Sequence, residues 1–228
     1  MIEIFQAGQF GKTKTLVEMH KFRKLVFKDR MGWDIPITED GLDIDEFDLP
    51  ETVYMVIRDK QERIVGTWRF TPTDGPSMIR DIWPEFTEDF AIPYDHNCWE
   101  LSRFGVHTYD QERNDHIEQV NKVTATMITA LMEMFTLADI PYAYTLYHLP
   151  VGRSIRKVGF IPDIISEQHL LDGKPAVAVR FPMTQCDLTR IQSITGIYCG
   201  ITVDDLPPIL KEKVSVNYTK KERIAAYG

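Results

Sequence analysis

The stretch "WELSRFGV", residues 99–106, predicts a strand near the middle of the chain, and its charges are unusual for a strand. Side chains of a strand point alternately to its two faces, so Glu100 and Arg103, three residues apart, are expected to point in opposite directions. A half-buried strand normally carries its charges on the solvent face only. Large apolar side chains flank both of these charges. A charged side chain on each face of the strand therefore needs a structural or functional explanation.

Outward from this strand, predicted helices alternate with predicted strands. Apolar residues at three- and four-residue steps predict helices over 12–30 and 115–139, and a short helix follows Pro150. Further strands are predicted at 2–5, 53–58, 63–71 and 142–147 and in "FIPDII" and "PAVAVRF", with a short strand and a helical turn in "GPSMIRDIWPEF". This order predicts a mixed sheet with helices on both faces, a single α/β sandwich. We expect a main domain over 1–185 and an extension over 186–228, with one or two short helices and no assigned role.

Composition excludes several classes of function. The 228 residues carry 26 basic and 34 acidic side chains, so the net charge of -8 argues against broad nucleic-acid binding. Three cysteines without metal-type spacing are typical of a reducing compartment. The chain has no signal-peptide-like start and no apolar run of about 18 residues. We therefore expect a cytoplasmic protein that does not bind membranes.

The predicted N-terminal helix carries the first of three charge clusters, in "HKFRKLVFKDRMGW" (20–33). Arg23, Phe27 and Arg30 are expected to share one helix face, with Trp33 just past the helix end. A basic face exposed to solvent is the commoner explanation of such a pattern. The two aromatic rings beside the arginines instead favour a wall of the kind that holds adenine and carboxylate groups.

The second cluster is acidic and the third lies on strands. No lysine or arginine occurs in residues 31–52, which include "DIDEFD" (43–48). Because this run lacks the glycine and the closing glutamate of a calcium loop, we expect no metal there. Arg69 in "GTWRF" and the Glu100 and Arg103 pair form the third cluster. Each charge alone is more often part of a structural ion pair, but together they predict one polar site at the edge of the core.

In this order and spacing, the residues resemble the acyl-homoserine-lactone synthase family, the autoinducer synthases of bacterial quorum sensing. The resemblance covers residues 1–185 and runs through "FRKLVFKDRMGW", "DEFD", "WRF" and "WELSRF". Its eight positions are Arg23, Phe27, Trp33, Asp45, Asp48, Arg69, Glu100 and Arg103.

The resemblance implies both a fold and a reaction. The implied fold is a three-layer α/β/α sandwich of N-acetyltransferase type, whose mixed twisted sheet opens into a V-shaped cleft. The implied reaction is N-acylation of S-adenosylmethionine by a thioester on acyl carrier protein or coenzyme A, followed by lactone closure with loss of methylthioadenosine. It requires no metal or other cofactor. The strand 99–106 is then expected to line the cleft, one face serving acyl transfer and the other anchoring the acidic loop.

The resemblance also suggests roles for individual residues. Glu100, with Arg103, is the expected catalytic pair, Glu100 acting as the base directly or through one water. Expected around S-adenosylmethionine, or in the charge cluster that supports it, are Arg23, Phe27, Trp33, Asp45, Asp48, Arg69, Ser102 and Phe104. The three arginines could hold carboxylates of the substrate or those of Asp45 and Asp48.

An acyl pocket is expected between the long helix and "YAYTLY", lined by Leu101, Met127, Leu131, Thr145 and Tyr147. The alternative is that Met127 and Leu131 are simply core residues. In the family, a threonine placed like Thr145 often accompanies a 3-oxo acyl chain. Tyr147 and His148 stand where many members have small residues, which could shorten the pocket or favour a branched or aromatic acyl group from coenzyme A. The acyl chain length stays open.

Docking of an acidic carrier protein requires a local basic patch, because the chain itself is acidic. Arg153 and Lys157 in "VGRSIRK" are four residues apart and match positions that the family uses for this purpose. The alternative is a solvated helix face with a favourable C-terminal charge.

Two other functions stay open at this point. The chain could be an ordinary acyl-CoA-dependent N-acyltransferase acting on another amine, although "HLPVGRS" has a single glycine where such enzymes carry a glycine-rich loop. It could also be a non-catalytic module that senses acyl ligands, which would need none of the charged set.

Overall fold

The computed structural model describes residues 1–109 and 113–214, and the side chains of 1–109 and 121–214. An 8-stranded mixed sheet runs in the order β1-β2-β3-β4-β5-β8-β6, with β7 paired to β8. The strands are β1 Ile2–Gln6, β2 Val53–Arg58, β3 Ile64–Pro72, β4 Cys98–Val106, β5 Tyr142–His148, β6 Asp163–Ile164, β7 His169–Leu171 and β8 Lys174–Pro182. The α-helices are α1 Thr13–Arg23, α2 Met78–Ile82, α3 Arg113–Leu137, α4 Leu149–Lys157 and α5 Gln185–Thr195.

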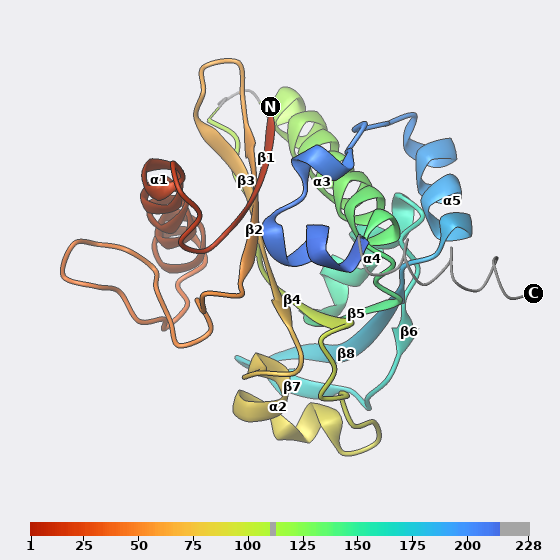
Figure 1. Cartoon of the computed structure of the whole chain (residues 1–228). Coiled ribbons are helices and arrows are strands. Elements are labelled where there is room, and N and C mark those ends of the chain that lie inside the picture. The colour runs from red at the N-terminus through yellow and green to blue at the C-terminus, as the bar shows by residue number, and fades with distance from the viewer. Residues whose placement is uncertain (110–112, 215–228) are drawn as a thin grey trace, which may run out of the picture.

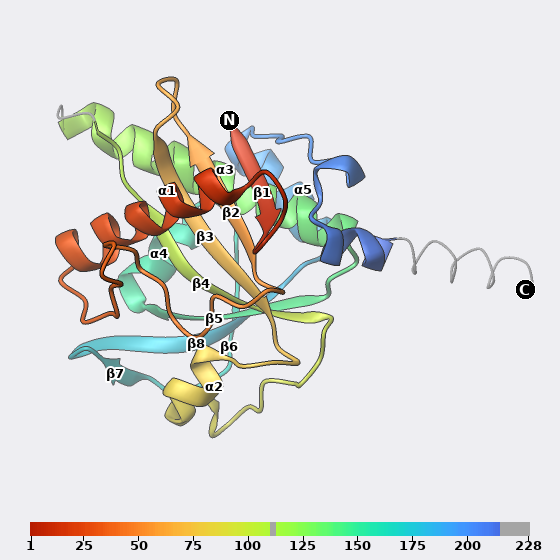
Figure 2. The same ribbon diagram turned by 60° about the vertical axis from the view of Figure 1, so that its left-hand side comes forward.

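Helices cover both faces of this sheet (Figures 1 and 2). α1 lies on one face, and α3, α4 and α5 lie on the other. The larger apolar core fills the space under α3 and includes Met127 and Leu131, whereas a smaller core under α1 includes Phe22 and Phe27. The predicted α/β/α layering is therefore present.

The sheet opens between its two central strands. β4 and β5 pair in parallel only through Cys98–Glu100 and Tyr142–Tyr144. Immediately beyond this ladder the Thr145 hydroxyl donates a hydrogen bond of 2.7 Å to the backbone oxygen of Leu101, at the point where the strands part. The V-shaped cleft expected from the sequence is thus the unpaired second half of these strands.

A β-bulge corrects the expected alternation along β4. Thr67 pairs with Gly105 and Arg69 with Ser102, so one residue of β3 lies opposite two residues of β4. Arg103 is in the bulge with a φ of 54°, a left-handed conformation that is uncommon outside glycine. The extra residue turns its side chain to the face that carries Ser102. The prediction that opposite faces of this strand carry Glu100 and Arg103 is therefore wrong, because the charges share one face.

The N-terminal helix also departs from its regular pattern. After α1, residues Lys24–Arg30 form a π-helix, whose wider turns break the expected seven-residue repeat. Arg23 is buried under the sheet, whereas Arg30 is exposed and its Nη1 lies 2.8 Å from His107 Nδ1. The shared face predicted for Arg23, Phe27 and Arg30 therefore loses Arg30.

Other segments differ less from expectation. The stretch "GPSMIRDIWPEF" forms α2 and a 3-10 turn, Pro84–Thr87, with no strand, and β7 was not predicted. In the predicted extension, α5, a 3-10 turn at Val203–Asp205 and helical residues 208–214 follow one another. Ile191 and Leu210 from this part are fully buried in the larger core. Residues 215–228 of the extension lie outside the described part of the chain.

Candidate active site

Arg23 joins α1 to the acidic loop and is fully buried. Its guanidinium donates to Asp43 at 3.1 and 3.0 Å, and to Asp48 at 2.6 and 3.1 Å. Two bidentate carboxylate contacts fix the guanidinium in position. Because these partners lie 20 and 25 residues away, Arg23 anchors a loop that has little secondary structure of its own.

Arg69 and Arg103 extend this ion network across the sheet. Arg69 Nη1 donates to Asp45 at 2.5 Å, and its Nε donates to the Ser102 hydroxyl at 2.9 Å. Arg103 Nη2 donates to the other oxygen of Asp45 at 2.7 Å, and its Nε lies 3.2 Å from Asp43. The predicted convergence of helix, acidic loop and strands on one cluster is therefore present.

The ion network consists of three arginines and three aspartates, listed as Arg23, Arg69, Arg103, Asp43, Asp45 and Asp48. Each of the six side chains is at most 6% exposed. Burial by itself raises the pKa of Asp48, but the charges of Arg23 and Arg69 hold that pKa well below its usual range. In this structure the three arginines contact the carboxylates of Asp43, Asp45 and Asp48.

Glu100 lies beside this network but has its own partners. It is 3% exposed, and the backbone N–H of Met78 donates to its Oε1 at 3.1 Å. Its Oε2 accepts from the Ser77 hydroxyl and, at 3.4 Å, from the Ile79 N–H. Burial raises the pKa of Glu100 above its ordinary value, and the hydrogen bond from Ser77 opposes the rise. Such a carboxylate is poised to accept a proton nearer to neutral pH.

Two chambers meet at β4 and share part of its residues as lining. The first, called the polar chamber below, has a volume of about 300 Å³. The charged residues among its lining are mostly acidic, namely Asp34, Asp45, Glu46, Glu100 and Asp172, with Arg103 as a basic member.

The second, called the apolar chamber below, has a volume of about 160 Å³ and is lined mainly by aromatic and aliphatic groups, among them Trp68, Phe104, Tyr147, Ile155, Phe160 and Phe181. Residues common to both linings are Trp33, Leu101, Ser102, Arg103, Leu146 and Leu171. A reactive group in one chamber can therefore meet a reactive group in the other beside Glu100.

An aromatic pair, Phe27 and Trp33, forms part of the chamber walls. Phe27 and Trp33 stack with their ring centroids 5.1 Å apart, as expected from the sequence, and the Arg103 guanidinium lies 5.6 Å from the centre of the Phe27 ring. Trp33 lines both chambers. The predicted aromatic and cationic wall is thus formed by Phe27, Trp33 and Arg103, without Arg30.

Comparisons with known proteins agree with this geometry. A family model described as autoinducer synthase matches residues 9–191. The chain belongs to the autoinducer synthase family. An acyl-homoserine-lactone synthase of Vibrio anguillarum is 29% identical over 171 residues, which cover 74% of this chain and 86% of that protein. The family and the class of acyl-transferring enzyme expected from the sequence are confirmed.

Solved structures show the same fold. The AHL synthase LasI is 26% identical with a TM-score of 0.74, covering 87% of this chain and 97% of that one. A CoA-dependent acyl-homoserine lactone synthase, BjaI, solved with SAM and isopentyl-CoA, aligns at a TM-score of 0.78 with 19% identity, covering 93% and 98%. The N-acetyltransferase-like sandwich expected from the sequence is confirmed.

In this autoinducer synthase several predicted site residues lie elsewhere. Met127 and Leu131 are fully buried in the core under α3 and do not line the apolar chamber. Phe104 packs against Trp68 at 4.8 Å between ring centroids, apart from the ion network. Leu101, Thr145 and Tyr147 line the apolar chamber as predicted.

Other site residues were missed by sequence reasoning. Asp43 is fully buried and holds both Arg23 and Arg103. It stands two residues before Asp45 in the same acidic run, so the run itself contained a signal. Ser77, which donates to Glu100, and Tyr54, which donates to Asp48 at 2.9 Å, carried no sequence signal. Their roles depend on contacts between distant segments.

The basic residues of α4 are exposed. Arg153 and Lys157 both face solvent, while Val151 and Ile155 of the same helix line the apolar chamber. The predicted basic patch therefore lies on the helix that forms one wall of this chamber. Its role in docking stays a prediction.

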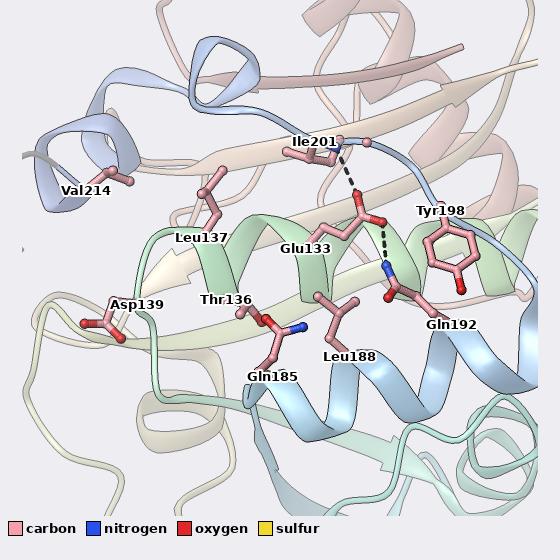
Figure 3. Close-up of a pocket in the computed structure, with 11 residues that line it drawn as sticks. Glu133, Thr136, Leu137, Asp139, Gln185, Leu188, Gln192, Tyr198, Ile201 and Val214 are labelled. Atoms are coloured by element: carbon pink, nitrogen blue, oxygen red, sulfur yellow. Dashed lines mark hydrogen bonds between the residues drawn. The ribbon is translucent and has the colours of Figure 1, made fainter. Parts of the chain in front are cut away.

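Another hollow lies between α3 and α5, with a volume of about 650 Å³ (Figure 3). Its acidic side chain Glu133 accepts hydrogen bonds from Gln192 and from the backbone N–H groups of Cys199 and Ile201. The Glu133 carboxylate thus fixes the position of the chain after α5 through these hydrogen bonds. This hollow contains no counterpart of the ion network, so we do not assign the reaction to it.

Among the described side chains, those of residues 1–109 and 121–214, no group of three or more histidine, cysteine, aspartate or glutamate residues is arranged to hold a metal ion. In the same described ranges no helix is long and apolar enough to cross a membrane.

Proposed function

We propose that this autoinducer synthase acylates the amino group of S-adenosylmethionine from an acyl thioester and closes the product to an acyl-homoserine lactone. The observation that carries the proposal is the meeting of two unlike chambers at residues 101–103, beside Glu100. One chamber is acidic and suits a small cationic molecule. The other is apolar and suits a hydrocarbon chain.

The polar chamber fits S-adenosylmethionine by charge and by shape. This substrate carries an ammonium and a sulfonium group, which the surrounding carboxylates attract, and one carboxylate, for which Arg103 is the nearest basic lining residue. Trp33 and its stacking partner Phe27 supply a flat apolar surface for the nucleoside end. The ion network keeps the chamber walls fixed before any substrate binds.

Glu100 is the proposed base for acyl transfer. The ammonium must lose a proton before its nitrogen can attack the thioester carbonyl, and a carboxylate of raised pKa can take that proton directly or through one water. The attack forms the amide bond and releases the donor thiol. Ser77 and the N–H groups at the start of α2 hold the carboxylate in place during this step.

Lactone closure then depends on positioning. The substrate carboxylate attacks its own γ-carbon, the carbon–sulfur bond breaks, and methylthioadenosine leaves as a neutral thioether. The sulfonium is already an excellent leaving group, so no strong base is needed. The enzyme needs to fold the carboxylate back onto the γ-carbon, which a fixed chamber achieves by proximity.

The acyl donor is proposed to carry a strongly anionic carrier, either acyl carrier protein or coenzyme A. The exposed Arg153 and Lys157 on α4 provide positive charge beside the apolar chamber, where either carrier would deliver its chain. We further propose that the enzyme works in the cytoplasm, where both substrates are made, and needs no metal or other cofactor.

Release of methylthioadenosine tests the whole proposal. Purified enzyme is incubated with S-adenosylmethionine and a panel of acyl-carrier-protein and acyl-CoA thioesters, and methylthioadenosine, free thiol and lactone mass are measured. Equal amounts of all three products, dependent on both substrates, are expected. Thiol release with another amine and no methylthioadenosine would indicate an ordinary N-acyltransferase. Thioester binding without any turnover would indicate a sensing module.

A further inference from the structure

The apolar chamber is small for an acyl-binding site. Its volume is about 160 Å³, and an engineered protein cavity of about 150 Å³ lined by aliphatic and aromatic groups holds one molecule of benzene. A chamber of this size therefore accommodates about six carbon atoms. A chain of ten or twelve carbons would need space that the chamber does not contain.

One part of the chamber wall belongs to the closely packed core. Phe160 and Phe181 stack face to face with ring centroids 3.7 Å apart, and they are 2% and 1% exposed. Both belong to the larger core, as does Ile155 of α4. Because protein interiors are packed to nearly crystalline density, a longer chain could enter only by displacing these rings.

Tyr147 forms part of the chamber wall, beside Val151 and Ile155 of α4, and its ring packs on Gly152 of that helix. A Cβ atom on Gly152 would lie 2.5 Å from Cε2 of the Tyr147 ring, closer than any real Cβ contact. The ring therefore lies directly on the α4 backbone and is 8% exposed. The same Cβ would lie 3.0 Å from the Tyr147 hydroxyl oxygen, so the ring and its hydroxyl both lie against Gly152.

From this geometry we propose that Tyr147, seated on Gly152, limits the acyl group of this enzyme to about six carbons, as a short straight chain or a compact branched or ring-bearing group. The inference rests on the proposed function and adds a substrate class to it. One methylene too many in a hydrophobic pocket changes discrimination by about 10–200-fold. The preference against long chains is therefore expected to be steep.

Chain-length competition tests this inference. Straight acyl groups of four to twelve carbons, on whichever carrier supports methylthioadenosine release, compete for the wild type, and lactones are quantified by mass. We expect the six-carbon donor to exceed the twelve-carbon donor in kcat/KM by more than about 100-fold. Tyr147→Ala removes the wall and should reduce this ratio to below about 10-fold. Tyr147→Phe keeps the ring and should keep the ratio.

Gly152→Ala provides a change of opposite sign. The added methyl must displace the Tyr147 ring from α4 toward the chamber, so the optimum is expected to move to four carbons. Circular dichroism and thermal melting establish that each variant is folded, and Tyr147→Leu replaces Tyr147→Ala if the latter does not fold.

Equal use of six- and twelve-carbon donors by the wild type, or an unchanged ratio in folded Tyr147→Ala, overturns the inference while leaving the proposed function intact. No methylthioadenosine release with any donor overturns the proposed function itself.

Discussion

The polar and apolar chambers share a stretch of β4 but are held by different forces. Walls of the polar chamber depend on charged contacts between segments as far apart as Asp43 and Arg103. Walls of the apolar chamber are part of the packed core, with Phe160 and Phe181 in direct contact. Under the proposed function, charge controls the chemistry and the positions of the reacting groups, while packing controls which acyl group enters.

The largest effect is expected at the point where the chambers meet. Glu100→Gln keeps the hydrogen-bonded shape but removes the base, so kcat should fall by about 10²–10⁴-fold. The acyl-chain preference should stay that of the wild type, because the apolar chamber is unchanged. Methylthioadenosine release at several chain lengths measures both quantities. A variant with near wild-type kcat would remove Glu100 from the chemistry.

Removing one member of the ion network should lower the stability of the fold, because the network holds the walls of the polar chamber together. Asp43→Ala removes one of the two buried carboxylates that each of Arg23 and Arg103 contacts, so positive charge is left in excess, and the free energy of unfolding should fall by about 3–5 kcal/mol. Glu39→Gln removes a charge from an exposed position in the same loop and should change it by less than about 0.5 kcal/mol. Urea unfolding of both variants decides whether the network stabilises the fold.

Loss of the hydrogen bond from Ser77 to Glu100 should change the pH dependence of kcat/KM. Because this bond lowers the pKa of Glu100, Ser77→Ala should raise that pKa further. The base acts when deprotonated, so activity is lost as the pH falls through its pKa. The acid limb of the kcat/KM profile should therefore shift to higher pH in the variant. Raising the pH should restore activity in the variant. Ser193→Ala, at an exposed position of α5, is the matched control. An acid limb that stays at the same pH in Ser77→Ala would contradict the role assigned to Ser77.

The smallest effect is expected from the surface beside the apolar chamber. Reversing charge at Arg153 and Lys157 together should lower kcat/KM with an anionic carrier about 10-fold at low salt, and less as salt rises. Activity with a small neutral acyl thioester should not change. The double variant Lys14→Glu and Lys21→Glu makes the same change in net charge on α1. If both double variants behave alike, α4 is not the docking surface.

Much of the site was readable from the sequence because periodicity and residue type are local properties. The alternation in "WELSRFGV", the helical spacing before Trp33 and the acidic run after it identified the strand, the aromatic wall and most of the ion network. They also led to the family. These features need no knowledge of which segments touch.

Only the tertiary structure decided where the side-chain ends lie. One extra residue in β4 places the Arg103 side chain on the face that carries Glu100. The local sequence does not predict this β-bulge, because the bulge depends on how β4 pairs with β3. The contacts of Asp43 with two arginines, and the burial of Met127 away from the apolar chamber, likewise depend on how distant segments pack. A packed core and a lined chamber use the same apolar residues, and three-dimensional packing alone determines which of them face the space that remains.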